Sequence, residues 1–318
     1  WITDNLQKTM TFLAKNLSNV ESIKKGNSRK FITKFQHWLR ENTLSRSKKN
    51  IHAHYDLGNA FYELWLDSSM TYSSALFQNL EEEPLESAQK NKYQKIIDSL
   101  NLKSGDNILE IGCGWGGFIE HASKLGINVT GLTISKEQFD YASSRITNLG
   151  GTQKILYEDY RVHEGLYDAV VSIEMLEAVG SKYWNEYFKS IKRFLKPGSS
   201  ALVQVITMHD EYFKTYNVDP DFIQTYIFPG GELISDEVFF NCASTISLEC
   251  KKVRSFGDSY AKTLELWNEE FQKRWDSVRE LGFDIKFKRT WEMYYAYCIG
   301  GFLSDRLDVT QFKLTCND

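Results

Sequence analysis

From residue 85 onward, stretches with the helical spacing of apolar residues alternate with short, continuous apolar runs typical of buried strands. The pattern predicts helices over 85–100, 117–125, 136–149 and 184–195, and strands over 107–111, 128–132, 154–158, 167–173 and 201–206. Pro197 and Gly198 are expected to end the last of these helices. Because strands separated by helices need parallel crossovers, we predict an α/β fold with a doubly wound, mostly parallel sheet.

After Thr207 this alternation breaks down. Residues 208–240 are rich in aromatic side chains, and beyond them we predict a strand over 248–253, helices over 260–281 and 286–303, and a strand over 309–314. The irregular spacing of the aromatic residues, with Asp-Pro and Pro-Gly-Gly turns, favours a covering lid, although a packed core segment is the alternative. No repeat of fixed period occurs, and the polar run 45–50 is the candidate hinge.

A glycine loop between a predicted strand and a predicted helix is the sharpest chemical signal. Residues 109–117 read LEIGCGWGG, so the glycines follow the first strand of the doubly wound sheet, where such folds bind nucleotides. The spacing of Gly112, Gly114 and Gly117 satisfies the G-x-G-x-x-G pattern of dinucleotide sites and also the acidic-x-G-x-G pattern of S-adenosylmethionine sites. The glycines alone do not separate these two cofactors.

The residues around the loop favour S-adenosylmethionine. A dinucleotide site usually has an acidic residue at the end of the second strand, whereas that strand here ends in Leu132, Thr133, Ile134 and Ser135. Glu110 precedes the glycines, where its charge suits a sulfonium and an amino group but opposes a pyrophosphate. A turn that serves only helix-strand packing is the remaining alternative.

Composition is that of a folded globular chain: 318 residues, 42% of them hydrophobic and 25% charged, with 4 prolines. No apolar run reaches the ~18 residues of a membrane-spanning helix. The 5 cysteines form no C-x-x-C pair, which predicts neither a disulfide framework nor a zinc site and fits a reducing cytoplasm. The chain begins at Trp1 rather than Met, so we expect further residues upstream.

Charge is distributed unevenly. Lysine and arginine greatly outnumber acids in residues 1–54, whereas the whole chain has a net charge of −4 and a pI of about 6.0. Apolar residues recur among these lysines at helical spacing, a pattern typical of a membrane-surface helix or of a packed helix with a solvated face. Nucleic acid is not expected as a partner, because the rest of the chain is acidic.

Wider motifs resemble a known family. They are HYDLGN at 54–59, MTYSSA at 70–75, LEIGCGWGGF at 109–118, GLTISKEQ at 131–138, DYR at 159–161, SIEMLEAVG at 172–180 and YIFPG at 226–230. Together they resemble the cyclopropane-fatty-acyl-phospholipid synthases and mycolic acid cyclopropane synthases over residues 50–318. Residues 1–50 resemble only the end of an amino-terminal membrane-contact domain.

The resemblance implies a fold and a domain organisation. We expect a class I S-adenosylmethionine methyltransferase, Rossmann-like and with seven strands, preceded by an N-terminal helical segment and carrying an inserted helical lid. The expected domains are a basic helical segment, 1–50, and a catalytic domain, 51–318, with the lid around 208–240.

The same resemblance implies the site residues. S-adenosylmethionine is expected against Tyr72, Ser73, Glu110, Gly112, Gly114, Gly116, Thr133, Ile134, Gln138, Tyr160 and Arg161. A bicarbonate ion is expected beside the reacting methyl, held by Ser74, Glu177, Gln204, the backbone of Ile206 and Tyr260. Ser74 and Gln204 replace the more usual cysteine and histidine, yet keep hydrogen-bonding capacity.

Two further residues have weaker assignments. Cys298 is carried over from the family as a possible site residue, although a buried structural thiol is the simpler interpretation, because nothing basic beside it in the sequence would lower its pKa. His54 is expected to be a hydrogen-bonded structural histidine.

The implied reaction transfers a methyl or methylene group to the double bond of an unsaturated phospholipid acyl chain. A carbocation would form, and aromatic faces would stabilise it, for which Phe213, Tyr216, Phe222, Tyr226 and Phe228 are the candidates. We expect a homodimer, cytoplasmic and peripheral on the inner membrane face. Methylation of a soluble small molecule and a non-catalytic lipid-binding module are the alternatives.

Overall fold

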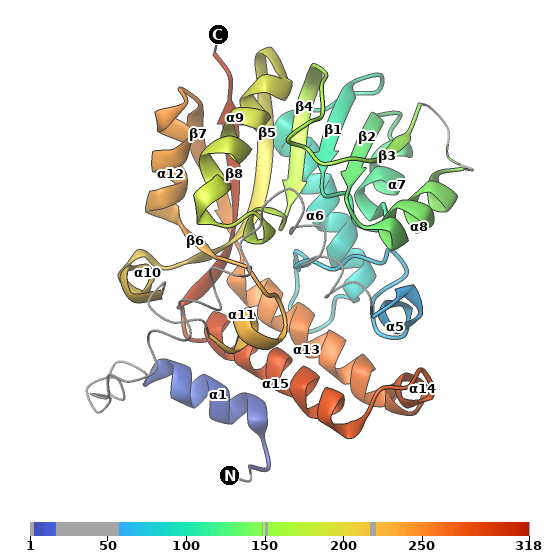
Figure 1. The fold of residues 1–318 in the computed structure, drawn as a ribbon, viewed down its shortest axis with the longest axis vertical. Coiled ribbons are helices and arrows are strands. Elements are labelled where there is room, and N and C mark those ends of the chain that lie inside the picture. Colours follow the sequence, from blue (N-terminus) through green and yellow to red (C-terminus); the bar gives the residue numbers. More distant parts are fainter. Residues whose placement is uncertain (1–2, 17–56, 148, 150–151, 217–220, 318) are drawn as a thin grey trace.

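The computed structural model describes residues 3–16, 57–147, 149, 152–216 and 221–317. One sheet forms their centre (Figure 1), with its strands in the order β3-β2-β1-β4-β5-β8-β7 and the short β6 paired to β5 beside this path. Neighbours from β3 to β5 are parallel, and β8 is antiparallel to both β5 and β7. The strands are β1 (Asn107–Ile111), β2 (Asn128–Thr133), β3 (Lys154–Tyr157), β4 (Tyr167–Ile173), β5 (Leu195–Met208), β6 (Ile234–Ser235), β7 (Glu249–Ser255) and β8 (Leu307–Thr315). The predicted doubly wound, mostly parallel sheet of seven main strands is confirmed.

Helices cover both faces and one edge of this sheet (Figure 1). They are α1 (Leu6–Lys15), α5 (Asn59–Glu63), α6 (Leu85–Leu100), α7 (Gly117–Ser123), α8 (Lys136–Ile146), α9 (Trp184–Phe194), α10 (Asp210–Tyr216), α11 (Phe222–Tyr226), α12 (Asp236–Thr245), α13 (Gly257–Lys273), α14 (Trp275–Glu280) and α15 (Ile285–Phe302). Two short 3-10 helices, Leu176–Ala178 and Ser181–Tyr183, follow β4.

Alternating side chains of the central strands separate two cores. Leu109 belongs to the cluster that contains Phe188 of α9 and Phe239 of α12. Ile108, its neighbour in β1, belongs to the cluster with Phe118 of α7 and with residues of α6. Since successive strand residues point to opposite faces, each strand is apolar on both sides, which explains why these strands read as continuous apolar runs.

Two predicted boundaries are wrong for local reasons. Pro197 and Gly198 do not separate a helix from a strand but lie within β5, which begins at Leu195 directly after α9. The β4–β5 register shifts between the pairs Tyr167–Leu195 and Ala169–Ser200, so the segment that contains the proline and the glycine is left out of that ladder. The predicted helix 260–281 is two helices, α13 and α14, which meet at Arg274.

A third layer lies at the carboxyl ends of the parallel strands, where α1, α11, α13 and α15 gather (Figure 1). Large aromatic side chains, including Trp65, Trp267, Trp291 and Tyr295, fill its interior. α1 packs against α15 at Gly300, where an added Cβ would lie 3.0 Å from the backbone carbon of Met10. The amino-terminal helix thus sits on the same layer that closes the sheet's ligand-binding edge.

The described residues set limits on two expectations. Within them, no helix is long and apolar enough to cross a membrane, and no cluster of three or more His, Cys, Asp or Glu side chains is placed to hold a metal ion. Most of the basic segment 1–54, the hinge 45–50 and His54 lie outside the described residues. The region expected as a lid contains α10, α11 and β6, with residues 217–220 outside the described part.

Candidate active site

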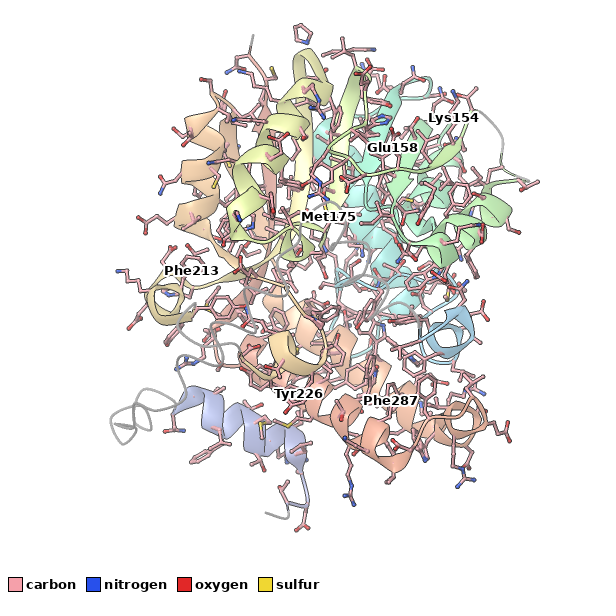
Figure 2. The ribbon with its side chains drawn as sticks, in the orientation of Figure 1. Lys154, Glu158, Met175, Phe213, Tyr226 and Phe287 are labelled. Carbon is pink, nitrogen blue, oxygen red and sulfur yellow. The ribbon has the colours of Figure 1, made fainter. Side chains whose placement is uncertain are left out.

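The glycine loop forms the wall of a cavity at the end of β1. Gly112 and Gly114 have φ values of +81° and +52°, the left-handed region in which glycine is favoured. A Cβ on Gly114 would meet no heavy atom within 4 Å, so this glycine faces open space in the cavity. A Cβ on Gly112 would lie 2.8 Å from Cγ of Met175 (labelled in Figure 2). Only glycine therefore lets the segment after β4 pack this closely against the loop.

Most residues predicted to bind the cofactor line this one cavity. They are Tyr72, Ser73, Glu110, Gly112, Gly114, Thr133, Ile134, Gln138, Tyr160 and Arg161. Gly116 does not line it, because its Cα faces α8 and an added Cβ would lie 3.3 Å from Cβ of Ala142. Gly116 therefore shapes the start of α7, with φ +84°, rather than the cavity wall.

The far end of the cavity is organised by hydrogen bonds between its own walls. Thr133 donates from Oγ1 to Oε1 of Gln138 over 2.9 Å, and Ser135 caps α8 by accepting from the Gln138 backbone N–H. Arg161 donates to both carboxylate oxygens of Asp159, at 2.9 and 2.6 Å, and lies over the Tyr160 ring. Thr133, at the end of β2, and its partner Gln138 stand where a dinucleotide site would have an acidic residue.

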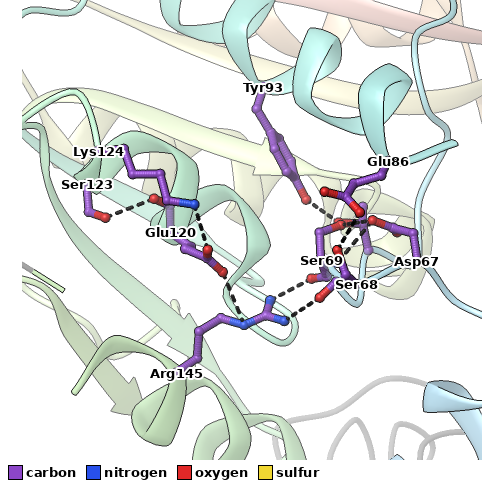
Figure 3. A network of polar contacts seen from close by, with 10 residues as sticks. Asp67, Ser68, Ser69, Glu86, Tyr93, Glu120, Ser123, Lys124 and Arg145 are labelled. Carbon is purple, nitrogen blue, oxygen red and sulfur yellow. Dashed lines mark hydrogen bonds and ion pairs between the residues drawn. The ribbon is translucent and has the colours of Figure 1, made fainter. Parts of the chain in front are cut away.

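A network of polar contacts holds the segment that carries Tyr72 and Ser73 (Figure 3). Arg145 of α8 donates to the backbone oxygens of Ser68 and Ser69, at 3.0 and 2.6 Å. Thr71, within the segment, hydrogen bonds to the hydroxyl of Tyr93 on α6. The cavity floor is thus tied to two helices that the sheet itself supports.

Two buried ionisable side chains, one acidic and one basic, lie at the cavity floor. Glu110 is buried, its Oε2 atom has no hydrogen-bond partner in the described part of the chain, and burial raises the pKa of its carboxyl to about 8. Lys92 of α6, which the sequence analysis did not identify, is fully buried, donates from Nζ to Oγ of Ser73 over 2.6 Å, and has a pKa lowered by burial to about 8. An unpaired carboxyl oxygen in a glycine-walled cavity suits a cationic ligand, so the residues present fit S-adenosylmethionine.

A second, larger cavity of about 620 Å³ adjoins the first. Its walls come from α1, α10, α11, α13 and α15, and include Met10, Leu13, Leu264, Met293 and Phe302. Tyr72, Glu174 and Ala178 line both cavities. These three residues mark the place where a group bound in one cavity can reach a group bound in the other.

Several predicted residues gather at this junction. Glu177, Ile206, Tyr260 and Cys298 line the larger cavity. The backbone N–H of Ile206 donates to Oε1 of Glu177 over 2.7 Å, while Oε2 of Glu177 has no partner among the described residues. Burial first, and the neighbouring Glu174 second, raise the pKa of Glu177 to about 8.

Glu174 is the junction residue that the sequence analysis missed. Its Oε1 atom accepts from the backbone N–H of Ser74 over 2.9 Å and from Nε2 of Gln204 over 2.8 Å. Tyr260 lies close enough to favour the charged form of the same carboxyl group. Burial raises the pKa of Glu174, and Lys92 and these donors oppose that rise.

Ser74 and Gln204 are fully buried and line neither cavity. The Ser74 hydroxyl donates to the backbone oxygen of Ala75 over 2.9 Å, and the amide oxygen of Gln204 accepts from Nε2 of Gln311 over 2.9 Å. Both residues therefore reach the junction only through Glu174.

The aromatic residues proposed to stabilise a cation divide into two groups. Tyr216 and Phe228 line the large cavity, together with Tyr72, Tyr260 and Tyr294, which were not among those candidates. Phe213, Phe222 and Tyr226 do not line it; Phe222 packs in the aromatic cluster around it, and the side chain of Tyr226 is 68% exposed on α11 (Figure 2). Cys298 lies on the cavity wall, but burial raises the pKa of its thiol, which makes it a poor nucleophile.

Comparisons with known proteins agree with this architecture. Residues 41–312 match the family model described as mycolic acid cyclopropane synthetase. The chain is 35% identical over 95% of its length to the tuberculostearic acid methyltransferase UfaA1 of Mycobacterium tuberculosis, spanning 75% of that protein. It is 37% identical over 81% of its length to the cyclopropane-fatty-acyl-phospholipid synthase of Escherichia coli, of which it spans 65%.

Solved structures lead to the same group. The mycolic acid cyclopropane synthase CmaA1, complexed with SAH and CTAB, superposes with a TM-score of 0.78 at 30% identity, covering 84% of this chain and 98% of that one. Coclaurine N-methyltransferase, at 17% identity and a TM-score of 0.72 over 98% of this chain and 94% of that one, shares the fold.

Proposed function

The chain belongs to the mycolic acid cyclopropane synthetase family of S-adenosylmethionine-dependent methyltransferases, and from this premise we propose that it adds a methyl or methylene group to the double bond of an unsaturated phospholipid acyl chain. One observation carries the proposal: the glycine-walled cavity and the apolar cavity of about 620 Å³ meet at Tyr72, Glu174 and Ala178. A small polar acceptor would have no need for so large an apolar cavity.

Methyl transfer to an alkene at the junction needs an environment that excludes water and contains electron-rich aromatic rings. When bound, S-adenosylmethionine supplies a methyl group activated by the sulfonium charge. The rings of Tyr72, Tyr260 and Tyr294 stand at or beside the junction, and the hydroxyls of Tyr72 and Tyr294 bond to each other over 3.0 Å. Their faces would stabilise positive charge on the acyl chain, and their packing excludes water that would quench it.

Bicarbonate, which the family resemblance implies, does not fit these residues as they stand. Three of the donors expected to hold it are engaged: Ser74 N–H and Gln204 Nε2 with Glu174, and the Ile206 N–H with Glu177. A second anion between two carboxyl groups would also be repelled. The proposed reaction therefore includes no step through bicarbonate.

The membrane surface supplies the substrate in this proposal. Met10, Leu13 and Ala14 of α1 line the acyl cavity, and Phe12 on the same helix is 66% exposed. We take the basic segment 1–50 to contact the anionic inner leaflet from the cytoplasm and α10 with α11 to form a lid over the bound chain. A homodimer completes the proposal, and light scattering of the purified chain tests it.

Transfer of labelled methyl tests the function directly. The purified chain is incubated with methyl-labelled S-adenosylmethionine and vesicles of dioleoyl phospholipid, and separately with small amine, hydroxyl and thiol acceptors. We expect the acyl chains alone to gain one CH₂ by mass spectrometry. Labelling of a small acceptor instead would support a soluble-substrate methyltransferase, and vesicle binding without any transfer would support a lipid-binding module.

A further inference from the structure

We propose that Glu174 is the catalytic base of this enzyme and that its carboxylate takes the place of a diffusible anion, so that turnover needs no bicarbonate. The inference rests on the proposed function, because a base is required only if a carbon acceptor loses a proton after methyl transfer. It concerns a residue of the SIEMLEAVG segment that the family resemblance did not assign.

The position of Glu174 matches the role. It lines both the cofactor cavity and the acyl cavity, so its carboxyl group faces the only region where the transferred methyl and the acyl chain would meet in the described cavities. Ser74 N–H and Gln204 Nε2 both donate to Oε1, over 2.9 and 2.8 Å. Two donors from separate segments thus fix one carboxylate at the junction.

Neighbouring charges decide which of the two junction carboxyls is ionised. Glu174 receives two donors and the field of Lys92, all of which favour its charged form. Glu177 receives one backbone N–H, retains an unpartnered Oε2, and is disfavoured as an anion by Glu174 itself. The hydrogen bonds therefore favour a negative charge on Glu174 over one on Glu177.

The backbone of Glu174 is strained. Its φ of +50° lies in the left-handed region, which a glutamate adopts at a cost and which a glycine would adopt freely. Strain at a buried ionisable side chain is typical of a functional constraint. It also means that Glu174→Gly relieves the backbone rather than damaging it.

The proposed step balances atoms and charge. The π electrons of the alkene form a bond to the methyl carbon, the carbon–sulfur bond breaks, and its electron pair stays on sulfur, which leaves a neutral thioether and a cationic acyl carbon. Glu174 then removes one proton from the added methyl or from the adjacent chain carbon. The C–H electron pair forms the ring bond or the new double bond, and the protonated carboxyl later releases its proton to water.

Bicarbonate dependence is the first test. Wild-type turnover is measured with S-adenosylmethionine and dioleoyl vesicles in buffer freed of carbon dioxide, and again with added bicarbonate. We expect equal rates. A large loss of wild-type rate in the depleted buffer that bicarbonate restores would overturn the proposal.

Three variants form the second test. Glu174→Gln keeps the size of the side chain and should lower turnover ~10²-fold or more, with S-adenosylmethionine affinity little changed. Glu174→Gly should be similarly slow, but added formate or bicarbonate should restore part of its rate by occupying the space beside the Ser74 and Gln204 donors. Glu237→Gln, on the exposed surface of α12, is the matched control and should retain the wild-type rate. Full activity of Glu174→Gln would refute the assignment, as would a Glu174→Gly variant that no anion rescues.

Anion binding separates failure of this inference from failure of the proposed function. Binding of ¹³C-bicarbonate, followed by NMR, needs no acyl substrate. We expect binding to Glu174→Gly and none to the wild type. Should the wild type methylate no acyl chain yet follow this binding pattern, the proposed function fails while the placement of Glu174 stands; bicarbonate binding to the wild type at the junction would overturn that placement.

Discussion

The wild type should release a proton when the cofactor binds, and replacement of Glu110 by glutamine should abolish that release. Glu110 lies in the glycine-walled cavity with its Oε2 atom unpartnered and a pKa raised by burial to about 8. We expect it to face the amino group of the bound cofactor. A positive charge beside it favours the ionised carboxylate, so binding should expel the proton that burial retains.

The magnitude follows from that pKa. A carboxyl with a pKa of about 8 is roughly 90% protonated at pH 7, so binding should release up to ~0.9 proton. The affinity should rise with pH: as the pH falls below about 8, the dissociation constant should increase ~10-fold for each pH unit, until the lowered pKa of the complex is reached. In Glu110→Gln there is no proton to expel, and the affinity should depend on pH far less.

Calorimetry with S-adenosylhomocysteine isolates this residue. That ligand keeps the amino group but lacks the charge on sulfur, and so it does not perturb Glu174 and Glu177 electrostatically in the way a sulfonium would. Titrations in two buffers with different ionisation enthalpies give the number of protons released. Equal proton release by the wild type and Glu110→Gln, or a wild-type affinity that is flat from about pH 6 to pH 8, would refute the reasoning.

Four further substitutions or conditions give additional tests. Gly114→Asp should abolish cofactor binding in calorimetry, whereas Gly114→Ala should weaken it modestly, because both side chains enter open cavity space but the larger carboxylate fills the space the cofactor needs. Without ligand, Glu110→Gln should raise the melting temperature more at pH 8 than at pH 5, since a folded-state pKa of about 8 penalises the wild-type fold as pH rises above the unfolded value near 4.5. Gly300→Val should lower both the melting temperature and vesicle-dependent turnover, because its side chain would push against the α1 backbone near Met10, while cofactor affinity stays near wild type. Vesicle binding should strengthen with anionic lipid and weaken in salt, as expected of the basic amino-terminal segment.

Hydrophobic patterning predicted the sheet well because each central strand is buried on both faces. The strand at 107–111 was placed at its observed bounds, and the strand at 167–173 likewise. Patterning failed where backbone geometry overrode it. Pro197 and Gly198 signal a break in any local interpretation, yet β5 continues through them since its β4 ladder skips that segment and β8 pairs from Ser200 onward.

The cofactor residues were predictable because they lie in local motifs, whereas the junction residues depend on contacts across the chain. Lys92 reads as one more charged residue on a helix, and only the packing of α6 beneath the cavity shows that it is fully buried. Glu174 stands three residues before Glu177, and in a helical turn this spacing would bring their side chains close together. Nothing local, however, shows that Ser74, 100 positions earlier in the chain, donates to it.

A base that is a side chain of the protein has a consequence for the product that a diffusible base does not. Oε1 of Glu174 is held by Ser74 and Gln204, so the proton acceptor occupies one position relative to the cofactor cavity and cannot follow the cation along the acyl chain. Because the Glu174 carboxylate is fixed, the position of the acyl chain against Tyr72, Tyr260 and Tyr294 decides which proton it removes. That proton comes either from the added methyl or from the neighbouring chain carbon. A small anion in the cavity opened by Glu174→Gly is free to approach either carbon. The wild type should therefore form one product, ring or branch, and the rescued variant a mixture of both.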